Sequence, residues 1–273
     1  MANDKPSLKR QRTYEQKSNT LKLPQFNINN IPPIPTNTAL LIVAVIALLI
    51  TMILTVNIQD NNNITENTTP TGTVTPTIVL GNSSYGNVIK EGPYGNVDSN
   101  VKIAYILGVH PREKGAHKLL EQAFNEKKNN LSYCYYLYKI NVTEDSKDFS
   151  QSRSNGQQLA YDYAVPDMIE NNFTFAVDSH YSNGHWGVTR FIFTPRENNI
   201  LSSELGHAMA ENFEWLTYYT PYDPTSPDYV TGPLNDGGVA AVIYEAYTED
   251  ENSTTLEHNR ELISFIDGWN FNK

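Results

Sequence analysis

An uninterrupted run of eighteen uncharged residues, ALLIVAVIALLITMILTV from Ala39 to Val56, constrains the chain more than any other feature. A helix rises about 1.5 Å per residue, so this run covers roughly 27 Å, close to the thickness of the hydrocarbon layer of a bilayer. The run also lacks the polar face that a surface helix of a globular domain carries. We therefore predict a transmembrane helix over residues 39–58 and a folded domain on one side of it.

The charges on the two sides of this run differ in sign. Residues 1–38 carry six basic and two acidic side chains, whereas residues 57–273 carry 14 basic and 28 acidic ones. Because basic flanks stay in the cytoplasm, residues 1–38 are predicted to be a disordered cytoplasmic tail, and the remainder to lie outside the cell. A cleaved signal peptide is the alternative, but its charged leader would be shorter and no cleavage site clearly follows. The acidic body also argues against nucleic acid as a partner.

After the predicted membrane span, the composition changes twice. Residues 59–96 are rich in Asn, Thr, Pro and Gly and have no sustained period, which indicates a stalk. In residues 97–273, apolar residues recur at the spacing of helices and strands. These residues are therefore predicted to form the folded domain. Cys134 is the only cysteine, so no internal disulfide is possible and the domain must be stable through its own core.

Short apolar runs alternate with helical segments along the predicted domain. The predicted strands are VKIAYILGV (101–109), LSYCYYLYKINV (131–142), FTFAVDSH (173–180), GVTRFIFTP (187–195) and GGVAAVIYEAYT (237–248). The predicted helices are 114–130, 156–171, 201–216 and 255–269. This alternation predicts an α/β domain of three layers, in which a mixed or mostly parallel sheet is flanked by helices.

Groups able to bind or assist a metal ion stand at the ends of three predicted strands. His110 and Glu113 follow the first strand, Asp178 and His180 end FTFAVDSH, and Glu245 lies in the last strand. In such folds, ligands gather where strands end and loops begin. Two imidazoles and a carboxylate are a frequent catalytic zinc set, and a further carboxylate can serve as general base. These residues therefore predict a catalytic metal site.

The ordered motifs GVHPRE, VDSH and VIYEAY resemble the zinc carboxypeptidase superfamily, including its succinylglutamate desuccinylase and aspartoacylase branch, over about residues 101–269. The resemblance implies one Zn²⁺ per chain and three ligands for it: His110, Glu113 and His180. It also implies that Glu245 is the catalytic carboxylate and that Arg112 and Arg153 act on the substrate. The chain departs from the family pattern at Ser152, where Asn is frequent, and in the 66 residues that separate Glu113 from His180, which imply trimmed loops.

Three further polar residues are candidates for the surroundings of the site. Asp178 lies two residues before His180 on the same face of a strand, so it can orient the imidazole or simply cap the strand end. His185, in the glycine-rich SNGHWG, and Arg190, on the next strand, are candidates for the substrate cleft. The second H-x-x-E of the chain, at 258–261, lies inside a predicted amphipathic helix and is interpreted as an ordinary solvated pair.

Together these features favour a membrane-anchored, extracytoplasmic, zinc-dependent amide hydrolase, similar to carboxypeptidases, that acts on peptides, for which cell-wall peptides are one candidate. The compact spacing of the motifs favours instead a deacylase or desuccinylase of N-acyl amino acids. A non-catalytic surface module that keeps the fold for binding is the third hypothesis. The sequence contains no G-x-S-x-G elbow, Walker loop or cysteine motif that would support another catalytic class.

Overall fold

The computed structural model describes residues 76–195 and 199–271 of the chain. The predicted cytoplasmic tail (1–38), the predicted transmembrane helix (39–58) and the first part of the predicted stalk lie outside these residues. Among the helices that are described, none combines the length and the apolar character that a membrane span requires. The predictions of a tail and of a membrane anchor therefore stay predictions.

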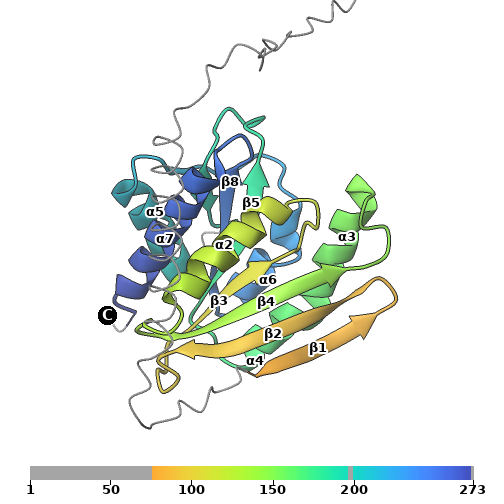
Figure 1. Cartoon of the computed structure of the whole chain (residues 1–273), viewed down its shortest axis with the longest axis horizontal. Helices are drawn as coiled ribbons and strands as arrows, with labels where there is room; N and C mark the ends of the chain where they lie inside the picture. The colour runs from red at the N-terminus through yellow and green to blue at the C-terminus, as the bar shows by residue number, and fades with distance from the viewer. Residues whose placement is uncertain (1–75, 196–198, 272–273) are drawn as a thin grey trace, which may run out of the picture. The chain divides into compact units, whose positions relative to one another are not determined.

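The described residues form one mixed sheet of eight strands (Figure 1). The strands are β1 Thr77–Ser83, β2 Gly86–Gly95, β3 Lys102–Leu107, β4 Cys134–Val142, β5 Phe175–Ser182, β6 Phe191–Phe193, β7 Thr217–Tyr218 and β8 Ala240–Tyr247. They lie in the order β1-β2-β4-β3-β5-β8-β6-β7. The central strands β4, β3, β5 and β8 are parallel, while β2 and β6 pair antiparallel to β4 and β8. The predicted mixed α/β sheet is confirmed.

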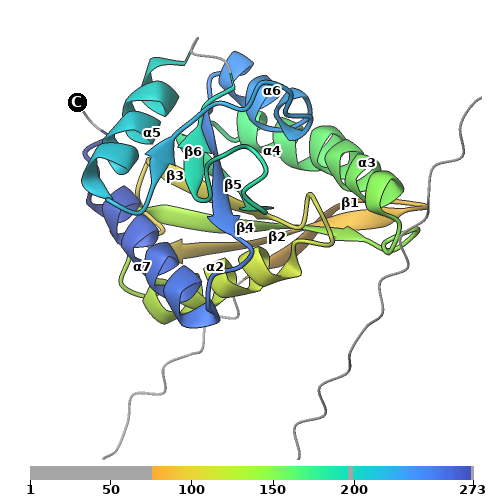
Figure 2. The same ribbon diagram turned by 90° about the horizontal axis from the view of Figure 1, so that it is seen from above.

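Helices cover both faces of the sheet, as Figure 2 shows from above. They are α2 Lys114–Lys127, α3 Phe149–Leu159, the π-helical turn η2 Ala160–Ala164, α4 Val165–Glu170, α5 Ile200–Asn212, the 3-10 turn η3 Ser226–Asp228, α6 Thr231–Asp236 and α7 Asn252–Gly268. Helices α2, α5 and α7 pack on one face of the sheet through Phe124, Met209 and Ile266. Helices α3 and α6 pack on the other face through Leu159 and Leu234. Burial on both faces explains why the central strands are continuous apolar runs.

The folded domain begins about twenty residues before the predicted boundary at residue 97. The prediction of a stalk over 59–96 is wrong for residues 77–95, because β1 and β2 form an antiparallel hairpin at one edge of the sheet (Figure 1). Buried and half-buried residues alternate along most of β2, which lies between β1 and β4, so β1 is the edge strand. The buried positions of β2 include Lys90 and two glycines, and Ile89 is among the half-buried ones, so apolar residues do not alternate in the sequence and the composition resembles a linker.

The helical segment that precedes β5 also begins earlier than predicted, at Phe149 in place of residue 156. The Asp148 side chain caps it by accepting a hydrogen bond from the backbone N–H of Gln151 at 2.6 Å. The segment continues through α3, η2 and α4, and the wider π-helical turn comes just before Pro166. Because the helix starts early, Arg153 lies within α3.

Helix α3 packs very closely against the loop that follows β3, and Gly156 makes this possible. A Cβ at Gly156 would lie 2.0 Å from the backbone oxygen of Val109. We expect Gly156→Ala to lower the free energy of unfolding by about 1–3 kcal/mol, since overpacking forces the backbones apart. Urea denaturation measures this, with Gly268→Ala as control because a Cβ there meets nothing within 4 Å. Equal stability of the two variants would contradict the close approach.

Candidate metal centre

The loop between β3 and α2 brings His110 and Glu113 to the carboxyl end of the parallel strands. Gly108 has φ +94°, and a Cβ there would lie 2.2 Å from the backbone oxygen of Ile140, so the turn requires glycine. Glu113 is the N-cap residue of α2, but its side chain makes no capping hydrogen bond. Its carboxylate is directed instead at two imidazoles.

His110, Glu113 and His180 converge on one point, although His180 comes from β5. Glu113 Oε1 lies 3.1 Å from His110 Nδ1, and Glu113 Oε2 lies 2.9 Å from His180 Nδ1. One candidate ligand atom from each residue lies within 4.8 Å of the others. Atoms bonded to one ion at about 2 Å are roughly 3–4 Å apart. The donor set and its spacing therefore fit a divalent cation, and the structure brings the three predicted ligands together.

The electrostatic surroundings keep two of these groups in the state that binds metal. Burial opposes the ionised form of Glu113, yet the charge of His180 and hydrogen bonds from both imidazoles hold its pKa well below the usual range. Burial and the His180 charge lower the pKa of His110 to about 4. Metal ligands must be ionised carboxylates or neutral imidazoles, so Glu113 and His110 need release no proton at neutral pH.

The ring nitrogen of His180 that does not face Glu113 contacts a second carboxylate. His180 Nε2 lies 2.9 Å from Asp178 Oδ2, and the hydroxyl of Ser226 donates to the same oxygen at 3.1 Å. Burial would lower the pKa of His180, but Asp178 and Glu113 raise it well above its ordinary value. A cation held by His180 Nδ1 would displace the proton from that nitrogen, while the Nε2–H group would stay hydrogen-bonded to Asp178. Of the two interpretations of Asp178, this geometry favours the orienting one.

The ring nitrogen of His110 that does not face Glu113 contacts a side-chain amide. The side-chain nitrogen of Gln157 lies 3.2 Å from His110 Nε2 and 3.2 Å from the hydroxyl of Thr225. The sequence did not single out Gln157, Thr225 or Ser226, because neutral polar residues in a helix and a proline-rich loop form no recognisable metal motif. Only the placement of α3 against the 108–113 loop reveals Gln157, and that placement depends on Gly156.

Glu245 faces the same cavity from the neighbouring strand. β5 and β8 are paired in parallel with His180 opposite Glu245, so both side chains emerge from one face of the sheet. Among the described residues, no hydrogen bond or ion pair to the Glu245 carboxylate is found. Burial raises the pKa of Glu245 to about 8, with the nearby carboxylates of Glu113 and Asp178 adding to the rise and the His180 charge opposing it. Such a group can exchange a proton near neutral pH.

The raised pKa of Glu245 predicts a pH-dependent stability for chelator-treated protein. Its ordinary value is 4.5 and its folded value about 8, so the folded state favours the protonated form. This contribution is fully present below about pH 4.5 and is lost as the pH rises through 8. We expect Glu245→Gln to be more stable than the unmodified chain at pH 9 by about 1–2 kcal/mol, after allowance for solvent contact. Urea denaturation at pH 5 and pH 9 measures this, and an unchanged pH profile would contradict it.

The ion site opens into a cavity of about 550 Å³, and Arg112, Phe149 and Arg153 form part of its lining. The guanidinium groups of Arg112 and Arg153 lie over the Phe149 ring, 5.5 and 5.3 Å from its centroid. Arg153 also donates to Glu113 Oε1 at 2.8 Å. Arg112 is exposed and has no ion pair among the described residues, so it remains available for a substrate anion.

The loop after β5 supplies an aromatic part of the lining. His185 and Trp186 line the cavity, with ring centroids 4.1 Å apart, and Trp186 meets the ring of Tyr222 edge to face at 5.1 Å. His185 thus lies where it was predicted. Arg190 does not line this cavity, which corrects its prediction: its Nε donates to Asp250 at 2.6 Å and its guanidinium lies over a tyrosine ring.

No protein-family model matches the sequence, and no curated protein matches it either. The fold is similar to that of a metallo-carboxypeptidase from Pseudomonas aeruginosa in complex with (2-guanidinoethylmercapto)succinic acid, at 12% identity and a TM-score of 0.46, over 67% of this chain and 60% of that one. The tripeptide-bound cell shape determinant Csd4 of Helicobacter pylori is 10% identical, with a TM-score of 0.46, over 66% and 54%.

A metallo-carboxypeptidase from Burkholderia cenocepacia is 9% identical to this chain, with a TM-score of 0.44, over 71% of this chain and 64% of that one. The chain thus spans less than two thirds of the length of these three structures. Each TM-score is below 0.5, so the function of the chain has to be inferred from the geometry of its own site.

Proposed function

We propose that this protein is a zinc-dependent amide hydrolase, similar to carboxypeptidases, that acts on peptides. One observation carries the proposal: the side chains of His110, Glu113 and His180 converge within 4.8 Å, and Glu245 faces the same cavity. A structural zinc site is closed by four protein ligands, whereas a catalytic site has three and leaves one position open. Three ligands and an unpaired carboxylate in a cavity match the catalytic arrangement.

Each residue of the site has a separate role in the proposed amide hydrolysis. A zinc ion bound there would lower the pKa of a bound water to about 7 and polarise the substrate carbonyl. Glu245 accepts the proton of the attacking water and returns it to the leaving nitrogen. Arg153, held at Glu113, places positive charge where the carbonyl oxygen becomes negative. Arg112 is free to pair with the carboxylate at the end of a peptide.

The experiment that tests this function combines metal analysis with a choice of substrates. The full chain, purified in detergent and loaded with zinc, should hold about one ion per molecule. It should release single residues from peptides with a free carboxyl terminus, as detected by mass spectrometry. Turnover of N-acyl amino acids alone would support the deacylase alternative. A chain that binds no ion, or that binds one and hydrolyses neither class, would end the proposal.

The proposed roles of the two arginines predict different kinetic effects. Arg112→Gln is expected to raise KM about 10- to 100-fold for peptides with a free terminal carboxylate, because a hydrogen-bonded charge pair is lost. Arg153→Gln is expected to lower kcat, because its guanidinium acts on the developing charge. Steady-state kinetics with free and amidated peptides separates the two. An equal effect of Arg112→Gln on both kinds of peptide would contradict its assignment.

We also propose that this hydrolase faces the outside of the cell on a membrane anchor. Support comes from the sequence only: the uncharged run within residues 39–58 and the basic residues that precede it. Peptides of the cell wall are the substrates that such a position would bring within reach. Extraction of membranes with alkaline carbonate, followed by protease treatment of intact cells, tests the anchor and its orientation. Release by carbonate, or protection of the domain in intact cells, would contradict this placement.

A further inference from the structure

We propose that Thr225 and Ser226 position the two imidazoles of the metal centre, Thr225 through the Gln157 amide and Ser226 through Asp178. The inference uses the metal centre of the proposed function but does not depend on hydrolysis. Thr225 and Ser226 are consecutive, and both also line the substrate cavity. One short segment of the chain therefore forms a wall of the cleft and supports both histidine ligands.

The segment that carries this pair is built to hold its shape. Three prolines lie within seven residues, Pro221, Pro224 and Pro227, and each fixes its own φ. The carbonyl of Ser226 accepts hydrogen bonds from the backbone N–H groups of Tyr229 and Val230, at 3.0 and 3.2 Å, as η3 begins. Ser226 itself is buried. A stiff segment can set the position of the groups that it contacts.

The contact to His110 runs through an amide that suits its chemistry. A histidine that binds an ion through Nδ1 carries its proton on Nε2, and that proton requires an acceptor. The amide nitrogen of Gln157 faces His110 Nε2, and rotation of the amide by about 180° brings its carbonyl oxygen to this position as the acceptor. The hydroxyl of Thr225, 3.2 Å from the amide nitrogen position, can donate or accept, so it matches either orientation of the amide. Valine at 225 would leave the amide without this partner.

The contact to His180 runs through a carboxylate with few partners. Asp178 Oδ2 is shared by His180 Nε2, at 2.9 Å, and the Ser226 hydroxyl, at 3.1 Å. Asp178 Oδ1 is buried and has no hydrogen-bond partner among the described residues. The Ser226 oxygen also lies 3.3 Å from His180 Nε2, so it touches both members of the pair. Loss of this hydroxyl would leave a buried carboxylate with the imidazole alone, at a cost in orientation.

Zinc affinity of the full chain, measured by competition with a chromophoric chelator, tests the proposal. Thr225→Val, Ser226→Ala and Gln157→Leu should each weaken zinc binding about 10- to 100-fold, as loss of an outer partner of a ligand does. Thr225→Ser keeps the hydroxyl and should restore affinity to within about threefold of the unmodified chain. The absorption spectrum of the cobalt-loaded protein should change in the same three variants, because the ligand geometry relaxes.

Two control substitutions separate positioning from loss of packing, at residues that are more buried than the exposed Thr225. Thr231 and Ser152 are fully buried, and their hydroxyls have no hydrogen-bond partner among the described residues. Thr231→Val and Ser152→Ala should therefore leave zinc affinity within about twofold, while removing the same atoms. Thermal unfolding in chelator checks that all variants fold. Thr225→Val and Ser226→Ala variants that bind zinc as tightly as these controls would overturn the proposal.

A double-variant cycle tests the route from Thr225 to His110. If Thr225 acts through Gln157, Thr225→Val should cause no further loss in a Gln157→Leu background, whereas Ser226→Ala should keep its full effect there. A full effect of Thr225→Val in that background would overturn the route through the amide. An unmodified chain that binds no zinc would instead contradict the proposed function itself, so the two failures are distinguishable.

Discussion

Replacement of Glu245 by glutamine is expected to lower kcat for peptide hydrolysis by about 10²- to 10⁴-fold, while the chain still binds one metal ion. The substitution keeps the shape of the side chain and removes its ability to accept a proton. Glu245 lies opposite His180 on the neighbouring strand, and the group of potential metal ligands consists of His110, Glu113 and His180 without it. Metal binding and catalysis should therefore separate in this variant.

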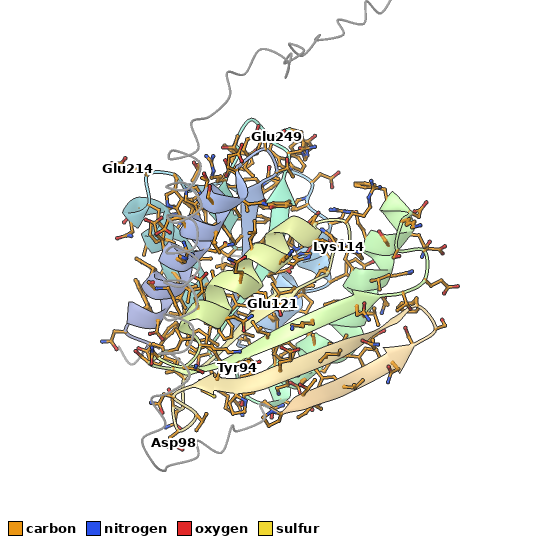
Figure 3. All side chains as sticks on the ribbon, viewed as in Figure 1. Tyr94, Asp98, Lys114, Glu121, Glu214 and Glu249 are labelled. Carbon is orange, nitrogen blue, oxygen red and sulfur yellow. The ribbon has the colours of Figure 1, made fainter. Side chains whose placement is uncertain are left out.

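The matched control is Glu249→Gln, an exposed carboxylate just beyond the end of β8 (Figure 3). This variant should retain both metal and activity, since Glu249 does not line the cavity. Metal content and kcat are measured on the same preparations. Loss of metal in Glu245→Gln would make Glu245 a ligand. Full activity of that variant would assign the proton transfer to another group.

The metal centre could be predicted from the sequence because its ligands follow buried strands. A continuous apolar run such as VKIAYILGV identifies a central strand, and the carboxyl ends of parallel strands share one edge of a sheet. His110 and His180 therefore had to approach one another once β3 and β5 were neighbours, which they are. The family resemblance indicates which role each of these residues has, and the order of the strands explains why their side chains lie close together.

The residues that the sequence did not reveal have a common physical cause. Gln157, Thr225 and Ser226 are defined by what they contact, and those contacts depend on how a helix and a proline-rich loop pack on the sheet. The β1–β2 hairpin resembles a stalk in composition because Lys90 takes a buried position and Ile89 a half-buried one, so its apolar residues do not alternate. Arg190 was assigned to the cleft, but a partner further along the chain, Asp250, binds its guanidinium.

Replacement of Glu113 by alanine is expected to have the opposite effect to Glu245→Gln, because the chain should no longer bind the metal ion. Its carboxylate contacts His110, His180 and Arg153, at 3.1, 2.9 and 2.8 Å, and accepts a hydrogen bond from the backbone N–H of Tyr181 at 3.2 Å. Binding of zinc to a full set of four ligands is worth roughly 10–16 kcal/mol, so loss of one ligand should weaken affinity at least about 10²- to 10³-fold. The anionic charge that offsets Arg153 beside the ion is lost as well.

Metal content after dialysis against a weak chelator measures this loss, and Glu121→Ala is the matched control on the same helix (Figure 3). Glu121 pairs with Lys139 at 2.7 Å on the surface, so its removal should cost at most about 1 kcal/mol of stability and no metal. Zinc bound to Glu113→Ala as tightly as to the control would place the ion elsewhere. The expected contrast, metal lost without Glu113 and kept without Glu245, would separate the carboxylate that binds from the carboxylate that carries the proton.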